Sequence, residues 1–306
     1  MRDVFCQSMV AEAHRRDLVF LTGDLGFKAL EPLRDVLGGR FINAGVAEQN
    51  MVSVAAGLAR AGLRPWVYSI APFVYARPFE QIRNDVCLHR LPVVLVGNGG
   101  GYGYGVMGAT HHALEDYGTL LGLPGLNVYV PAFDSDAQAQ IALLMQTLDP
   151  SYVRLGLSEL PQGMMAPAYA PWRHLQDGDG WTVLVVGSLV GGIWNAVHAL
   201  RAEHRPSLWS LCELPFKCPQ AFIDDLERSQ RLLVIEEHVA HGGVAEMLAA
   251  WILRSGRRLD QFETRAANGY LSGRYGSQRF HRQENRLDPE SIAQFLTSQP
   301  FRGCPA

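Results

Sequence analysis

The 306-residue sequence lacks the usual features of a membrane or secreted protein. Its longest apolar runs, such as 91–97 and 181–190, are well short of the ~20 residues that cross a bilayer. The first residues, Met1-Arg2-Asp3-Val4, do not form the charged-then-apolar pattern of a signal peptide. The five cysteines are scattered and form no C-x-x-C pair, which disfavours a disulfide framework and a zinc site. We therefore expect a protein of the reducing cytoplasm with no membrane partner.

The sequence also has no large excess of charge of one sign. Its 27 basic and 30 acidic residues give a formal net charge of −3 at pH 7. A nucleic-acid-binding protein normally carries a basic excess or patch, so we expect no nucleic acid partner. Hydrophobic residues make up 48% of the chain, which is enough for a buried core. At about 150 residues for each domain, the length predicts two domains.

Strand-like and helix-like segments alternate along the first 157 residues. Strands are predicted at 18–22, 40–43, 66–70, 92–97, 127–130 and 152–155, and helices at 3–16, 47–61, 79–88 and 134–148. In the helix over 47–61, apolar residues recur at the spacing of a buried stripe: Met51, Val54, Ala55 and Leu58.

The alternation stops over 158–180, where Pro161, Pro167 and Pro171 indicate a linker. It resumes with strands predicted at 182–186, 207–211 and 232–236, and helices at 193–203, 219–228, 243–254 and 288–297. Consecutive βα units imply mainly parallel sheets with helices on both faces. The predicted fold class is therefore α/β, with one domain over 1–157, the linker over 158–180 and a second domain over 181–306.

Three features are candidates for chemistry. The glycine-rich loop over 97–105 follows a predicted strand, where ligand crevices commonly lie, but it lacks the helix and acidic ribose ligand of a dinucleotide site. Glu48 begins the striped helix, where an acidic residue often only complements the helix dipole. His111 and His112 have no carboxylate or cysteine at metal-ligand spacing, which favours a catalytic or substrate contact over zinc. From these residues alone, the loop over 97–105 could equally be a plain surface loop, and Glu48 could serve only the helix dipole.

Taken together, the segments resemble the C-terminal half of transketolase. Residues 41–51, FINAGVAEQNM, resemble the pyrimidine-binding stretch of that family. Residues 108–112, GATHH, resemble its Gly-x-Thr-His element, and 233–238 followed by Gly242-Gly243 resembles its C-terminal domain. Deoxyxylulose-phosphate synthases and the β subunits of 2-oxoacid dehydrogenases share this architecture. The motifs therefore indicate the superfamily more firmly than any one of its members.

The resemblance implies one subunit of a split enzyme. A full transketolase carries an N-terminal diphosphate-binding domain, whose Gly-Asp-Gly segment and a later Asn hold the metal. In this sequence Gly178-Asp179-Gly180 lies in the predicted linker without a suitable Asn, so a turn is favoured. We therefore expect thiamine diphosphate to lie between subunits. The diphosphate and Mg²⁺ would be held mainly by a separate N-terminal subunit, in an α2β2 heterotetramer.

The resemblance also assigns roles to residues of this chain. Glu48 corresponds to the acid that bonds N1′ of the cofactor pyrimidine and so helps C2 to lose its proton; burial would favour sharing of that proton. Phe73 would stack on the pyrimidine, with a plain core phenylalanine as the alternative. Tyr75 and Arg77 are further candidate cofactor contacts. His111 corresponds to the histidine that contacts the reacting oxygens and moves protons.

Departures from the family pattern concern the substrate. Met107 stands where sugar-phosphate enzymes have an acidic residue, and Gly99 stands where they have a histidine. Leu157 takes the expected position of the phosphate-binding arginine, for which Arg154 is the candidate substitute. We therefore predict a specialised acceptor. Either at least one of donor and acceptor is unphosphorylated, or its phosphate is bound entirely by the partner subunit. The candidate substrate contacts are His111, His112, Tyr102, Met107 and Arg154.

These inferences combine into one predicted function. The chain would be a subunit of a transferase of the transketolase type (EC 2.2.1), active only with its partner. It would transfer a two-carbon ketol unit from a ketose donor to an aldehyde-type acceptor. The alternatives are the β subunit of a 2-oxoacid-decarboxylating or acyloin-forming enzyme and a non-catalytic scaffold subunit. The presence of both Glu48 and His111 weighs against the scaffold.

Overall fold

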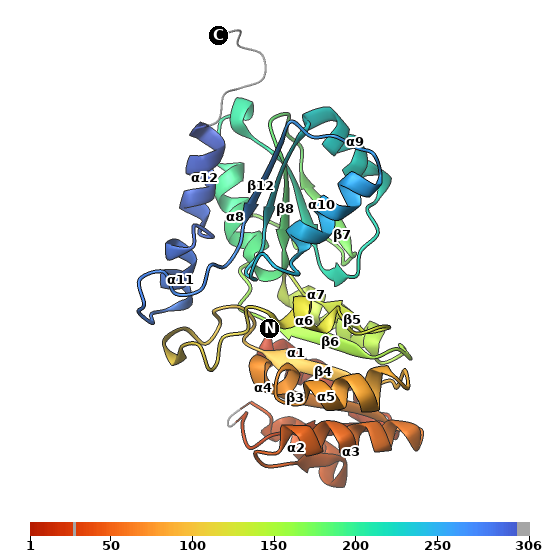
Figure 1. The fold of residues 1–306 in the computed structure, drawn as a ribbon. Coiled ribbons are helices and arrows are strands. Elements are labelled where there is room, and N and C mark those ends of the chain that lie inside the picture. Colours follow the sequence, from red (N-terminus) through yellow and green to blue (C-terminus); the bar gives the residue numbers. More distant parts are fainter. Residues whose placement is uncertain (27–28, 299–306) are drawn as a thin grey trace.

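The N-terminal half of the chain is built on a seven-stranded sheet of order β10-β5-β6-β4-β3-β1-β2 (Figure 1). The computed structural model describes residues 1–26 and 29–298. The strands are β1 (Leu18–Thr22), β2 (Phe41–Asn43), β3 (Arg64–Ile70), β4 (Val94–Asn98), β5 (Asn127–Tyr129), β6 (Ser151–Leu155) and β10 (Glu213–Leu214). All neighbouring strands are parallel except β10, which runs antiparallel to β5.

Helices cover both faces of this sheet. They are α1 (Arg2–Ala11), α2 (Glu31–Leu37), α3 (Glu48–Arg60), α4 (Ala71–Tyr75), α5 (Phe79–Gln81), α6 (Asp116–Leu120) and α7 (Asp134–Leu144), with a π-helical turn, η3 (Ile82–Cys87), after α5. Met51 and Ala55 of α3 are buried with Leu95 of β4 in one apolar cluster. Phe5 of α1 and Ile141 of α7 are buried in a second cluster, against the other face.

The C-terminal half has a five-stranded sheet of order β12-β11-β8-β9-β7. Its strands are β7 (Trp172–Gln176), β8 (Thr182–Val186), β9 (Ser207–Leu211), β11 (Arg231–Ile235) and β12 (Gln261–Arg265), and only β7 is antiparallel to its neighbour. Figure 1 shows α8 (Val190–His198) and α12 (Pro289–Ser298) on one side of this sheet and α9 (Gln220–Ser229) and α10 (Val244–Arg254) on the other. The short α11 (Gln278–Glu284) lies near the junction of the halves.

Two buried arginines join the two halves. Asp136 of α7 accepts two 2.7 Å hydrogen bonds from the guanidinium of Arg173 on β7. Arg154 of β6 pairs with Asp116 at 2.8 Å and donates to the carbonyl oxygen of Glu237, which follows β11. Because β10 also completes the N-terminal sheet from within the C-terminal half, the carboxyl ends of the N-terminal strands are held against the second half.

The predicted α/β class is confirmed, with helices on both faces of mainly parallel sheets. Several local predictions were wrong. The predicted linker contains β7, an edge strand whose polar neighbours hide its pairing with β9. The connection before β2 contains α2, whose second residue, Pro32, suits the first turn of a helix. The predicted helix over 79–88 is a short α-helix followed by the π-helical turn. Of the helices in the described ranges, none is both long and apolar enough to cross a membrane.

Candidate active site

Glu48 is a buried carboxylate at the first residue of α3. Its side chain is only 6% exposed, and the apolar residues of the predicted stripe, such as Met51 and Ala55, bury the helix behind it. Its Oε1 atom accepts a 2.7 Å hydrogen bond from Nη1 of Arg77. Among residues 1–26 and 29–298, no side chain or backbone group donates to its second oxygen, Oε2. The site therefore has a buried acceptor that is fixed on one side and free on the other.

Arg77 links Glu48 to two aromatic side chains. Its guanidinium carbon lies 3.7 Å from the ring centroid of Phe73, within the range of a cation–π contact. The ring of Phe73 in turn meets His111 edge-on, with 5.2 Å between centroids. His111 shares a 2.9 Å hydrogen bond with the hydroxyl of Thr110. Glu48, Arg77, Phe73 and His111 thus form a continuous line of contacts, which we call the site row.

Tyr104 adjoins the site row and was missed by the sequence analysis. Its ring centroid lies 5.8 Å from that of His111, and its hydroxyl accepts a 2.8 Å hydrogen bond from Asn98 at the end of β4. Burial is the main cause of its raised pKa, so the phenol stays neutral. The position of Tyr104 in the glycine-rich loop was the one available signal, but the loop sequence does not say which tyrosine turns toward the histidine.

The other two aromatic candidates and His112 lie outside the row. Tyr75 is buried and donates to Oε2 of Glu115 at 3.3 Å. Tyr102 is fully buried, and its hydroxyl donates to the carbonyl oxygen of Gly269 in the C-terminal half at 2.7 Å. His112 shares a 2.8 Å hydrogen bond with the hydroxyl of Tyr270, and burial lowers its pKa. These three side chains are engaged with the protein interior.

The remaining substrate candidates have contrasting surroundings. Arg154 is buried, and its guanidinium binds Asp116 and the carbonyl oxygens of Ala113 and Glu237. Met107 is 54% exposed on a short turn of the loop. Leu157 is 64% exposed and lines a cleft of about 930 Å³ beside the helices α8, α11 and α12, where Arg279 and Arg282 also line it. The guanidinium of Arg154 is therefore bonded inside the protein and is not free at the surface.

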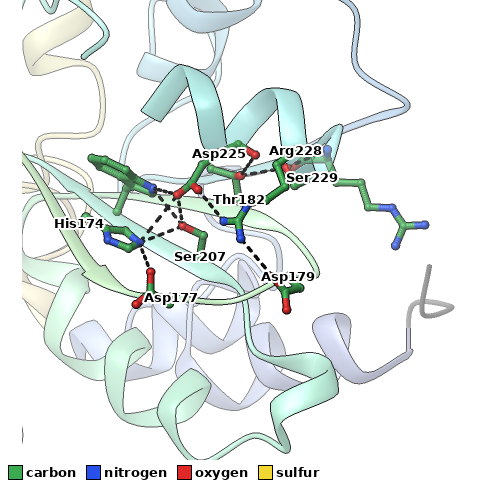
Figure 2. A network of polar contacts seen from close by, with 10 residues as sticks. His174, Asp177, Asp179, Thr182, Ser207, Asp225, Arg228 and Ser229 are labelled. Carbon is green, nitrogen blue, oxygen red and sulfur yellow. Dashed lines mark hydrogen bonds and ion pairs between the residues drawn. The ribbon is translucent and has the colours of Figure 1, made fainter. Parts of the chain in front are cut away.

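The Gly178-Asp179-Gly180 segment belongs to a structural network in the C-terminal half (Figure 2). Asp179 is exposed and pairs with Arg228 of α9 at 3.0 Å. Arg228 also pairs with Asp225, which accepts hydrogen bonds from Ser207 and Trp209 of β9. Within the described part of the chain, no three His, Cys, Asp or Glu side chains are grouped as a metal ion would require. This segment therefore joins strands to a helix.

Comparison with known proteins identifies the family of the chain. Residues 1–162 match the family described as transketolase, pyrimidine binding domain. The chain belongs to this family. The matched residues include the whole site row, from Glu48 to His111, and the predicted resemblance to transketolase is confirmed.

Relatives of similar length carry the same family's name. The chain is 29% identical to one subunit of the apulose-4-phosphate transketolase of Phocaeicola vulgatus, over 76% of this chain and 77% of that protein. It is 27% identical to the like-named subunit from Actinobacillus succinogenes, over 92% of each. A solved split-gene transketolase, described as an inactive β4 tetramer, has the same fold: its TM-score is 0.82 at 23% identity, covering 97% of this chain and 96% of that one.

Proposed function

We propose that this chain is the pyrimidine-binding subunit of a thiamine-diphosphate-dependent transferase of the transketolase type. Together with an N-terminal subunit it transfers a two-carbon ketol unit from a ketose to an aldehyde-type acceptor. The observation that carries the proposal is the site row, in which a buried carboxylate, an arginine, an aromatic ring and a histidine touch in sequence. Membership of the transketolase pyrimidine-binding family supports it.

The residues of the site row fit the pyrimidine of the cofactor. Oε2 of Glu48 is an acceptor in a water-poor position, where a hydrogen bond from a protonated ring nitrogen is stronger than in water. Phe73 is half-buried beside it and offers an aromatic surface for a planar ring. When bound, thiamine diphosphate supplies a carbon nucleophile for ketol transfer. Glu48 would hold a proton at N1′ of the pyrimidine, and its burial would keep water from that proton.

Arg77 orients Glu48 for this task. The hydrogen bond from Nη1 to Oε1 restricts rotation of the carboxylate and leaves Oε2 for the ligand. The contact with the ring of Phe73 holds the guanidinium in place. A planar arginine can make both contacts at once, which a lysine cannot do equally well. We therefore assign Arg77 a positioning role in addition to its predicted contact with the cofactor.

His111 is the group of this chain that would move protons on the substrate. Its Nδ1 atom is engaged by the hydroxyl of Thr110, which leaves Nε2 for a hydroxyl or carbonyl oxygen of the substrate. The edge of Phe73 fixes the plane of the imidazole ring. Phe73 contacts Arg77 on one side and His111 on the other. Through Arg77 it therefore holds Glu48, which serves the cofactor, in one rigid arrangement with His111, which serves the substrate.

The diphosphate and its Mg²⁺ would be bound mainly by the N-terminal subunit, in an α2β2 assembly. This part of the proposal is supported by the Gly-Asp-Gly segment, which in this chain is occupied by contacts with Arg228. Two relatives that match most of this chain are named as subunits, which also favours a split enzyme.

Both relatives named as subunits are from apulose-4-phosphate transketolases, and that name contains a sugar phosphate. In this chain the two positions expected to bind a phosphate do not suit that role. Arg154 is held inside the protein, and Leu157 is apolar. An unpaired phosphate against an apolar surface loses hydration without compensation. We propose that the part of the substrate that meets this chain is unphosphorylated, and that any substrate phosphate is bound by the partner.

The test uses the chain alone and reconstituted with its N-terminal subunit. Isothermal calorimetry should show weak binding of thiamine diphosphate to the chain alone and tight, Mg²⁺-dependent binding to the complex. The complex should consume a ketose such as xylulose 5-phosphate in the presence of an aldehyde, without release of CO₂. Consumption of pyruvate with release of CO₂ would instead favour the 2-oxoacid-decarboxylating alternative. A complex that binds the cofactor but turns over neither donor would favour the scaffold.

A further inference from the structure

The loop that carries His111 is held by hydrogen bonds to the C-terminal half of the chain. We propose that Glu237, which follows β11, is a positioning residue for His111: it holds the base of the loop over 101–113, which we call the site loop. This inference rests on the proposed function for the role of His111. The contacts of Glu237 with the site loop do not depend on that function.

Glu237 is buried and accepts hydrogen bonds from three sources. Its Oε1 atom accepts from the backbone N–H of Tyr102 at 3.2 Å. The guanidinium of Arg282 on α11 donates to Oε2 at 2.7 Å and to Oε1 at 3.2 Å. The side-chain amide of Gln278 donates to both oxygens, at 3.1 and 3.2 Å. One carboxylate therefore ties the site loop to α11.

The glycines at the base of the loop fit this contact closely. A Cβ atom on Gly101 would lie 2.6 Å from the carboxyl carbon of Glu237, and the φ angle of +64° at Gly101 also favours glycine. A Cβ atom on Gly100 would lie 2.4 Å from Nε of Arg154. Any larger residue would push the loop off the two charged groups. Glycine at positions 100 and 101 is therefore explained by close approach to Arg154 and Glu237.

Glu237 stays charged in this position. Burial alone would raise its pKa, but the nearby guanidinium groups of Arg282 and Arg154 outweigh burial and hold the pKa below its ordinary value. A charged acceptor forms stronger hydrogen bonds than a neutral one, so the N–H of Tyr102 is held firmly.

The position of Tyr102 is transmitted to His111 through a closed loop. Gly101 and Ala113 exchange two backbone hydrogen bonds, of 2.9 and 3.0 Å, which join the two ends of the site loop. The ring of Tyr102 stacks on His281 of α11 and meets His112 edge-on. His112 in turn bonds the carbonyl oxygen of Gly105 at 2.8 Å. Tyr104 and His111, which meet at the site row, lie between these anchored positions of the loop.

The experiment compares Glu237→Gln with a matched control in the complex with the N-terminal subunit. Glutamine keeps the size of the side chain but weakens the hydrogen bonds that residue 237 accepts from Tyr102 and Arg282. The control, Asp136→Asn, weakens the buried pair of Asp136 with Arg173 between the halves, which does not touch the site loop. Both variants should lower the thermal unfolding midpoint. Only the first should lower kcat for ketol transfer, by at least about tenfold, because small displacements of a catalytic group are costly.

Two further readouts separate positioning from general damage. Deuterium exchange at C2 of the bound cofactor depends on Glu48, and it should stay within about twofold of the wild type in Glu237→Gln. In the chain without its partner, the His111 ring resonances, assigned with His111→Asn, should shift in Glu237→Gln and remain unchanged in Asp136→Asn. Gly101→Ala places a methyl group against Glu237. It should also lower kcat and shift the His111 resonances.

The outcomes distinguish this proposal from the proposed function. Unchanged His111 resonances in Glu237→Gln, or equal losses of C2 exchange and turnover, would overturn the positioning role. A wild-type complex without ketol transfer would contradict the proposed function, while the resonance shift, measured without turnover, would still decide whether Glu237 positions His111. A shift confined to Glu237→Gln and Gly101→Ala supports the proposal.

Discussion

Arg77 donates a 2.7 Å hydrogen bond to Oε1 of Glu48 while its own side chain remains 44% exposed. The pair therefore combines a buried acceptor with a partner that reaches in from the surface. An ion pair between fully exposed groups contributes little, because water screens it. Here the carboxylate is sheltered at the start of α3, so the hydrogen bond has a geometric function: it fixes one oxygen and leaves the other for a ligand.

Replacing Glu48 with glutamine tests the role of the free oxygen. In the reconstituted complex, we expect Glu48→Gln to fold normally and to lose activity by at least roughly 100-fold, because an amide cannot share a proton with N1′ of the pyrimidine. Deuterium exchange at C2 of the bound cofactor measures the affected step directly. Exchange at the wild-type rate would mean that Glu48 merely complements the dipole of α3.

Replacing Arg77 with lysine tests the orientation of that carboxylate. Lysine keeps the charge but loses the planar group that bonds Glu48 and lies over Phe73, so we expect C2 exchange to fall by about tenfold, less than in Glu48→Gln. Arg83→Lys, at an exposed arginine on the π-helical turn, is the matched control and should leave exchange unchanged. Equal rates in the wild type and Arg77→Lys would show that charge alone suffices.

Part of this site could be predicted from the sequence. Apolar periodicity predicted the helix that begins near Glu48, although Val54 of its predicted stripe is 40% exposed. The resemblance to transketolase implied the buried position of Glu48, and local patterns located most of the parallel strands. These features depend on residues close together in the chain, whose periodicity and flanking turns are visible in one dimension.

Other features depend on contacts between distant segments. Arg154 was predicted as a substrate contact because it lies near the expected position of the phosphate-binding arginine. Its buried hydrogen bonds could not be predicted, since Asp116 lies on another element and Glu237 lies in the other half. The pairing of β7 with β9 and of β10 with β5 has no local signal either. Tyr104 and His111 meet across a loop in which Gly101, Gly105 and Gly108 have positive φ. Such placements follow from tertiary packing, which overrides local preference.

His238 makes stability depend on pH. Its Nδ1–H donates to the carbonyl oxygen of Val239, and its Nε2 accepts from the backbone N–H of Gly118, an arrangement that requires the neutral ring. Burial lowers its pKa from 6.5 to about 4. The unfolded chain therefore binds the proton more readily between these values. Stability is fully present above pH 6.5 and should fall as the pH approaches 4, by on the order of 3 kcal/mol from this residue.

Urea unfolding at pH 7.5 and at pH 5 measures this effect. His238→Gln should be less stable than the wild type at the higher pH, because it loses the stacking of the imidazole on Tyr117, whose ring centroid lies 3.8 Å away. Its stability should nevertheless change less between the two pH values. His112 and His281, whose pKa values burial also lowers, leave a residual slope of the same sign. An unaltered difference between the two pH values in His238→Gln would refute the assignment.

Substrate preference tests the apolar position at Leu157. This residue follows β6 by two positions, and the carbonyl oxygen of Leu155 at the end of that strand accepts 3.0 Å hydrogen bonds from the N–H groups of Gly99 and Gly100. Leu157 therefore lies on the segment next to the glycine-rich loop. In the wild-type complex we expect kcat/KM for an unphosphorylated aldehyde to equal or exceed that for ribose 5-phosphate, because no arginine of this segment is free to bind phosphate.

Leu157→Arg should reverse that preference. A guanidinium at this position could form charge-assisted hydrogen bonds with phosphate, so the ratio of kcat/KM for ribose 5-phosphate over the unphosphorylated aldehyde should rise by about tenfold or more. Leu160→Arg is the control, since Leu160 is an exposed leucine nearby in the sequence, at 52% exposure, and this substitution adds the same charge. If the wild type already prefers ribose 5-phosphate by orders of magnitude, and Arg154→Ala removes that preference in a folded complex, Arg154 leaves its buried pair with Asp116 to bind phosphate and the apolar interpretation of this surface is wrong.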